Sequence, residues 1–133
     1  MFNRPQNNIV FLDFDGPLYP STIHLFPENK NPEYDLIHPF ISYWKMDPIA
    51  VSMLNELNEK FKFEAVLSTS WCSLVPEKDA YERLFEANDL KLKFHEEWMT
   101  PRHRKNREEQ IEDWIWSNKP NDYVILDDAQ SGD

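Results

Sequence analysis

Apolar and polar residues along the chain change their spacing several times, and each change predicts an element. Continuous apolar runs of a few residues are typical of strands buried on both faces of a sheet. The predicted strands of this kind are residues 8–14, 64–68 and 123–127. The segment at 90–94 alternates apolar residues with lysines, which predicts a more exposed strand. Apolar residues at helical spacing predict three helices, at 48–61, 76–87 and 104–117.

Each predicted helix has an expected apolar face. Asp47-Pro48 provides an N-cap followed by proline at the first helical position, so the first helix should begin at Pro48. Its expected core face consists of Ile49, Met53, Leu54, Leu57 and Phe61. For the other two helices the expected core residues are Tyr81, Leu84 and Phe85, and then Ile111, Trp114 and Ile115.

The alternation of strands and helices indicates the fold class. Such a chain forms an α/β domain with three layers, α/β/α, around a Rossmann-like parallel sheet. We expect the first strand near the centre and a strand order of about 3-2-1-4. The whole chain, 1–133, should form one domain. Residues 17–45 have no clean period and are rich in proline, asparagine and aromatic residues, so we interpret them as a flap or small cap beside the site.

Composition narrows the class of protein. The hydrophobic fraction of 41% favours a globular fold over disorder. No apolar run is long enough to suggest a membrane span. A formal charge of −10 argues against non-specific nucleic-acid binding by the whole surface. The one cysteine, Cys72, cannot form an intramolecular disulfide and fits a reducing compartment, so we expect a cytoplasmic protein.

Aspartates follow two of the predicted buried strands. Asp13 and Asp15 come at the end of the first apolar run, and Asp127 and Asp128 directly follow the last one. Because parallel strands present their carboxyl ends at one edge of a sheet, we expect these four side chains to converge there. Clustered carboxylates repel one another unless a cation lies among them, and an all-oxygen ligand set suits Mg²⁺. The metal ion would in turn hold a phosphate.

These motifs resemble those of a known superfamily. Asp13-Phe14-Asp15-Gly16 is similar to the first motif of haloacid-dehalogenase (HAD) phosphohydrolases, and Asp127-Asp128 with Asp133 is similar to their acidic closing motif. Two further segments, Leu67 to Trp71 and Arg107 to Ile115, resemble a small branch of that superfamily. This branch is the phosphatase-like domain of Swiss Army knife RNA-repair proteins.

The resemblance implies a role for each aspartate. Asp13 would be the nucleophile that forms an aspartyl-phosphate, and Asp15 would act as general acid and then general base. Mg²⁺ would be bound by the carboxylates of Asp13, Asp127 and Asp128 and by the backbone carbonyl of Asp15. Because dehalogenases of the superfamily lack the second aspartate of the first motif, Asp15 favours phosphoryl chemistry. Asp133 fits the last acidic position of the closing motif.

The resemblance also implies residues that bind the phosphate. Either Ser68 or Thr69 would donate a hydroxyl hydrogen bond to a phosphate oxygen. A basic residue near the start of the third predicted helix would bind the same group, and Arg107 matches the branch best, with Lys105 as the second choice. Cys72 stands where the branch often has an arginine. This departure leaves the substrate class open.

The sequence therefore predicts a Mg²⁺-dependent phosphatase. Its substrate would be a phosphorylated small molecule, a nucleotide or a nucleic-acid end. The alternative is a catalytically inactive HAD-like module that binds a partner. Five residues follow the closing pair of aspartates, at 129–133. We therefore expect a minimal sheet, a truncated chain, or a partner chain or oligomer that completes the sheet edge.

Overall fold

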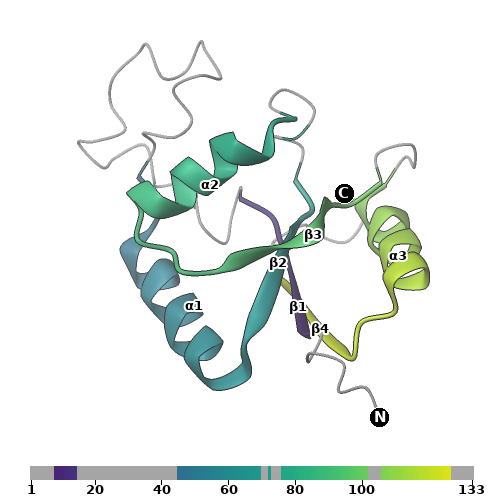
Figure 1. The fold of residues 1–133 in the computed structure, drawn as a ribbon, viewed down its shortest axis with the longest axis horizontal. Helices are drawn as coiled ribbons and strands as arrows, with labels where there is room; N and C mark the ends of the chain where they lie inside the picture. The colour runs from purple at the N-terminus through teal and green to yellow at the C-terminus, as the bar shows by residue number, and fades with distance from the viewer. Residues whose placement is uncertain (1–7, 15–44, 70–71, 73–75, 102–105, 127–133) are drawn as a thin grey trace.

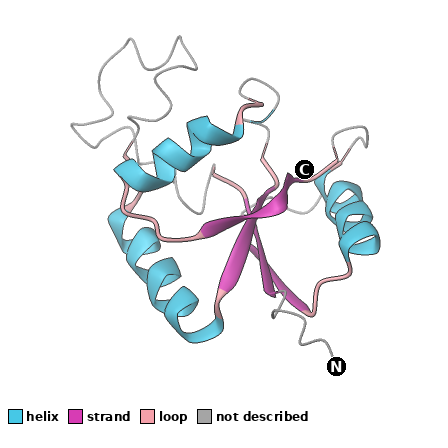
Figure 2. Cartoon of the chain, in the orientation of Figure 1, coloured by secondary structure: helices cyan, strands magenta, loops and turns pink. Residues whose placement is uncertain are grey.

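A parallel sheet forms the centre of the molecule (Figures 1 and 2). The structure, a computed structural model, describes residues 8–14, 45–69, 72, 76–101 and 106–126. The strands are β1 (Asn8–Leu12), β2 (Phe63–Leu67), β3 (Lys93–Met99) and β4 (Asp122–Leu126). The helices are α1 (Pro48–Phe61), α2 (Lys78–Ala87) and α3 (Arg107–Asn118). Within these residues the strand order is β3-β2-β1-β4 and all neighbours are parallel, which confirms the predicted order and fold class.

Strand β1 divides the core between the two faces of the sheet. Because side chains alternate along a strand, Val10 and Leu12 lie on one face while Ile9 and Phe11 lie on the other. The first face packs against α1 and α2, and the second packs against Ile111 and Trp114 of α3. Helices cover both faces, as the sequence predicts, and β1 is buried on both sides. The prediction that residues 123–127 form a strand buried on both faces is wrong, because β4 lies at an edge of the described sheet and its apolar residues Tyr123, Val124 and Ile125 are exposed.

Helix α1 has the predicted bounds, but it faces the core with a different row of residues. Val51 and Leu54 are its buried side chains, so Leu54 is the one member of the predicted core face that is buried. The other four predicted core residues are exposed: Ile49, Met53, Leu57 and Phe61. Asn58 and Asn55 explain this rotation. The Asn58 carboxamide oxygen accepts a hydrogen bond from the N–H of Phe63 at 2.8 Å. Asn55 bonds to the segment that follows α2, so both amides must lie on the inward side of the helix.

The third strand lies later in the chain than predicted. It spans Lys93–Met99, and the alternating segment at 90–94 mostly precedes it. Leu90 and Leu92 are buried in the core, so the apolar residues of this segment pack beneath α2 as a connection rather than as part of the strand. The strand lies at an edge of the described sheet, where Lys93, Glu96 and Glu97 are exposed. Phe94, Trp98 and Met99 are partly buried against the core.

Two further predictions concern the flap and the membrane. Residues 17–44 of the expected flap lie outside the described residues, so the flap stays a prediction. No helix in the described part of the chain is long and apolar enough to cross a membrane.

Candidate active site

Three backbone hydrogen bonds align the residues that follow the strands. The N–H of Asp13, just after β1, donates to the carbonyl of Leu126 at 3.0 Å. The N–H of Ser68, just after β2, donates to the carbonyl of Leu12 at 2.8 Å, and the N–H of Thr100 donates to that of Leu67 at 3.1 Å. The hydrogen bonds between neighbouring strands thus continue one residue beyond the end of each strand. Asp13, Ser68 and Thr100 lie side by side at the carboxyl edge of the sheet.

Asp13 forms an ion pair with Arg107 at this edge. The Nη1 atom of Arg107 donates to Oδ2 of Asp13 at 3.0 Å. The carboxylate is almost completely buried, with 5% of its side chain exposed, whereas 28% of the Arg107 side chain is exposed. A buried carboxylate requires a cation or several hydrogen bonds to remain charged. Arg107 provides the cation, and its side chain remains partly accessible to solvent.

The start of α3 positions Arg107. Asn106 caps the helix, because its side-chain oxygen accepts a hydrogen bond from the N–H of Glu109 at 2.8 Å. The Glu109 carboxylate in turn accepts from the Asn106 side-chain amide at 3.0 Å. Arg107 is therefore the first helical residue. A cation there opposes the helix dipole, and the bond to Asp13 offsets that modest penalty.

Phe14 anchors the chain immediately after Asp13. Its ring is fully buried and packs against Tyr81 and Phe85 of α2, at centroid distances of 5.6 and 6.3 Å. With the Asp13 N–H bonded to β4 and the next side chain held in the core, the Asp13 carboxylate has little freedom to move. Sequence reasoning missed this anchor, although an aromatic residue between two acidic ones was the available signal.

Both hydroxyl residues after β2 are buried at the same edge. Ser68 and Thr69 have little exposed surface, and among the described residues the Ser68 hydroxyl has no hydrogen-bond partner. Buried hydroxyls in proteins usually have one, so a polar group from a ligand could satisfy it. The Thr69 carbonyl accepts a hydrogen bond from the N–H of Cys72 at 3.3 Å, which closes the turn after β2. The structure leaves the choice between Ser68 and Thr69 open.

Thr100 is a second residue that sequence reasoning missed. It is buried beside Ser68, and both its N–H and its hydroxyl lie within hydrogen-bond reach of the Leu67 carbonyl. Thr100 was missed because the third strand was predicted to end at residue 94, too early for Thr100 to follow it directly. Once β3 ends at Met99, Thr100 occupies the same position as Asp13 and Ser68 do on their strands.

The remaining predicted site residues lie outside the described residues. They are Asp15, Lys105, Asp127 and Asp128, together with Asp133. The structure does show that β1 and β4 end in register, with Leu12 opposite Leu126, directly before Asp13 and Asp127 in the sequence. Among the described residues no group of three or more His, Cys, Asp or Glu side chains could hold a metal ion. Asp13, an oxygen ligand at the expected edge, fits a Mg²⁺ site as one member of it.

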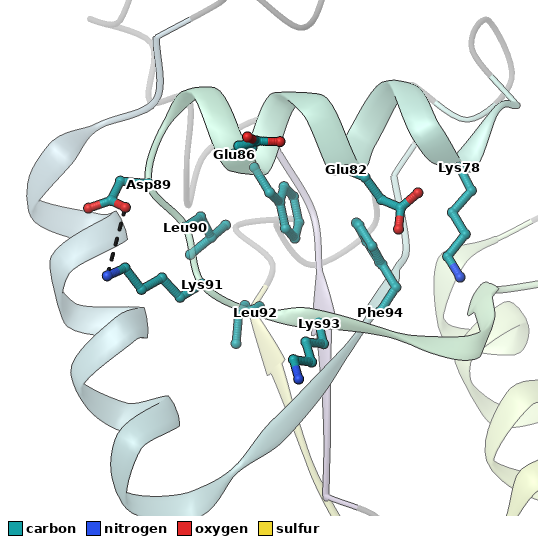
Figure 3. A pocket seen from close by; sticks show the side chains of 10 residues that line it. Lys78, Glu82, Glu86, Asp89, Leu90, Lys91, Leu92, Lys93 and Phe94 are labelled. Atoms are coloured by element: carbon teal, nitrogen blue, oxygen red, sulfur yellow. Dashed lines mark ion pairs between the residues drawn. The ribbon is translucent and has the colours of Figure 1, made fainter.

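A pocket of about 490 Å³ lies elsewhere, between α2 and the chain that leads into β3 (Figure 3). Lys91 and Lys93 line one side, and Glu82 and Glu86 on α2 line the other. No lining residue belongs to the edge that holds Asp13. With Phe85, Leu90 and Leu92 buried beneath it, the charged rim is a solvated surface over the core.

The fold and this edge define the class: a parallel α/β domain with a paired, buried carboxylate after its central strand. The family model described as the HAD domain in Swiss Army Knife RNA repair proteins matches residues 9–133, and the chain belongs to this family. This confirms the resemblance inferred from the motifs. Neither the curated proteins nor the solved structures gave a match. Family membership suggests a phosphohydrolase-type function.

Proposed function

We propose that the protein is a Mg²⁺-dependent phosphatase that works through an aspartyl-phosphate on Asp13. The observation that carries this proposal is the ion pair between the buried Asp13 carboxylate and the partly exposed Arg107. A purely structural pair could lie anywhere in the fold. This pair lies at the carboxyl edge of a parallel sheet, where ligands bind in open α/β folds.

The chemistry begins with the Asp13 carboxylate. One carboxylate oxygen attacks phosphorus, a P–O bond forms to Asp13, and the bond from phosphorus to the leaving oxygen breaks. Asp15 protonates that leaving oxygen and then removes a proton from the water that hydrolyses the acyl phosphate. The rigid backbone around Asp13, held by Leu126 and Phe14, keeps the nucleophile in one place and so lowers the entropy cost of attack.

Arg107 and the hydroxyl residues bind the phosphoryl group. Arg107 faces two anions, the carboxylate and the phosphate, and its planar guanidinium can donate to both. The Ser68 or Thr69 hydroxyl donates to a second phosphate oxygen. Asp13, Asp127, Asp128 and the carbonyl of Asp15 would hold Mg²⁺, which supplies positive charge to the phosphoryl oxygens.

The substrate class rests on the family alone. Its description refers to RNA-repair proteins, which favours a nucleotide or a nucleic-acid end over a phosphorylated small molecule. Because the net charge is −10, a nucleic-acid substrate would be contacted locally, at its phosphorylated end, rather than along an extended basic surface.

The decisive experiment removes the nucleophile without changing its shape. Asp13→Asn should reduce Mg²⁺-dependent hydrolysis of an aryl phosphate at least about 10³-fold, as loss of a nucleophile does in other enzymes. Asp79→Asn is the matched control, because Asp79 also pairs with an arginine, Arg83, but on the exposed surface of α2. Circular dichroism would show that each variant is folded.

Arg107→Ala tests the second partner. It should reduce turnover by about 10²–10³-fold, the cost of removing one charge-stabilising donor, while Arg83→Ala should leave turnover unchanged. Full activity of Asp13→Asn would exclude the proposed mechanism. If the parent protein hydrolyses neither aryl phosphates nor phosphorylated oligonucleotide ends with Mg²⁺ present, the inactive binding module is the correct interpretation.

A further inference from the structure

Helix α1 carries a row of exposed apolar side chains, which we name the α1 stripe. It consists of Ile49, Met53, Leu57 and Phe61, which are 69%, 60%, 42% and 52% exposed. The four residues are spaced four apart, so they form one continuous ridge along the helix. Single exposed apolar residues are common, whereas a contiguous row on one helix marks an interaction surface.

The stripe cannot be explained as a misplaced core face. Val51 and Leu54 already pack α1 against the sheet, and the amides of Asn55 and Asn58 are bonded to backbone groups on either side. Turning the helix to bury the stripe would break these bonds and expose Leu54. The helix is therefore held with its stripe outward by the interactions that dock it.

We infer that the α1 stripe is a self-association surface, on which the α1 helices of two copies pack antiparallel about a two-fold axis. A two-fold interface uses the same patch on both copies, so the patch must be self-complementary. With the axis midway between Met53 and Leu57, Met53 of each copy faces Leu57 of the other, and Ile49 faces Phe61. The stripe itself contains no charged residue, so apolar side chains meet apolar side chains along its length.

The charges at the two ends of α1 favour the antiparallel arrangement. Asp47 caps the start of the helix, and Lys60 and Lys62 lie at its end. Antiparallel packing brings Lys62 of one copy level with the start of the other helix, near Asp47. It also places the opposite ends of the helix dipoles together, whereas parallel packing would place like ends and like charges side by side.

The size of the α1 stripe determines how tightly two copies are expected to associate. A stable interface buries about 800 Å² on each partner, and one helix face with four apolar residues covers less than that. The net charge of −10 on each copy opposes association further. The dimer should therefore be weak, reversible and dependent on concentration, and added salt should strengthen it by screening the repulsion.

Sedimentation velocity over a range of concentrations tests the surface. Met53→Lys places a charge in the middle of the stripe and should weaken dimerisation at least tenfold. Ser52→Lys is the matched control, because it makes the same charge change at the neighbouring exposed position, off the stripe, and should leave the dissociation constant unchanged. A protein that is monomeric at every concentration, or a dimer insensitive to Met53→Lys, would overturn the inference.

Two further variants distinguish alternatives. In an antiparallel pair Ile49 and Phe61 of different copies are adjacent, whereas two Ile49 side chains are about 18 Å apart along the axis, from 12 residues at 1.5 Å each. A mixture of Ile49→Cys and Phe61→Cys chains should thus cross-link on oxidation more than either alone. Equal cross-linking of Ile49→Cys alone would exclude the antiparallel arrangement.

Strand β4, at an edge of the described sheet, also has exposed apolar side chains, among them Val124. Dimer loss in Val124→Lys, with Met53→Lys unaffected, would assign the interface to the β4 edge instead.

Discussion

Helices α1 and α2 lie on the same face of the sheet, yet they use their apolar residues in opposite ways. Helix α2 buries Tyr81 and Leu84 completely, whereas α1 leaves Leu57 and three other apolar residues exposed. Both helices have apolar residues at helical spacing, but they differ in how many of these residues are buried. Helix α2 places four buried side chains in the core cluster, whereas α1 places two there, Val51 and Leu54, with Ala50 partly buried against them.

The comparison separates two roles for an amphipathic helix. Through Tyr81 and Phe85, α2 contacts Phe14, the residue next to Asp13, so it supports the candidate active site directly. Helix α1 docks through Val51 and Leu54 together with the bonds of Asn55 to the segment after α2, and it keeps its apolar ridge for another surface. An apolar row at helical spacing therefore predicts that something will cover it, but not that the covering surface is the core of the same chain.

The largest expected change in the free energy of unfolding comes from a comparison of one leucine in each helix. Leu84→Ala should lower the free energy of unfolding by about 2–5 kcal/mol, because it leaves a cavity in a fully buried position. Leu57→Ala, the same change on the exposed stripe, should alter it by no more than about 0.5 kcal/mol when the protein is monomeric. Urea denaturation at low protein concentration measures both. Equal effects would mean that α1 is docked as deeply as α2.

A smaller loss of stability is expected when the hydrogen bond between the end of α2 and the start of α1 is removed. The side-chain oxygen of Asn88, at the end of α2, accepts a hydrogen bond from the N–H of Met46, just before α1, at 2.8 Å. Both residues are buried, so Asn88→Ala would leave that N–H unsatisfied and should cost about 1–3 kcal/mol of stability. Thermal denaturation would show the loss. The Asn88 side chain also donates to the Leu84 carbonyl at 2.9 Å, so amide exchange of Met46 separates the two bonds. If Met46 exchanges no faster in Asn88→Ala, the bond to Met46 is not the source of the loss.

The smallest effect concerns the exposed link between α1 and the segment after α2. Asn55 donates to the Asp89 carbonyl and accepts from the Lys91 N–H, each at 2.8 Å. Asn55→Ala should cost about 0.5–1.5 kcal/mol, since water can replace both partners. Faster amide exchange of Lys91 in the variant would locate the effect. If the exchange rate of Lys91 is unchanged, Asn55 does not hold the helix in its observed rotation.

Much of the fold follows from local pattern, and the failures have identifiable causes. The start of α1 was predicted because Asp47-Pro48 is a strong signal of a helix start, and the cap bond at 3.0 Å is present. Strand β3 was misplaced because Glu96 and Glu97 interrupt its apolar residues, so no continuous apolar run marks it. In the site, the types of residue were predictable, but the bond from Arg107 to Asp13 joins residues 94 positions apart. No local pattern encodes a pair of that separation.

The sequence by itself determined which segments become strands and helices, because capping, periodicity and buried apolar runs act over a few residues. It also determined the order of the sheet, since right-handed connections between parallel strands leave few arrangements. Only the tertiary structure decided that Arg107 reaches Asp13 and that α1 turns its richest apolar face outward. Both depend on how whole elements are rotated against the sheet, and that rotation is set by side-chain packing and amide hydrogen bonds between distant segments.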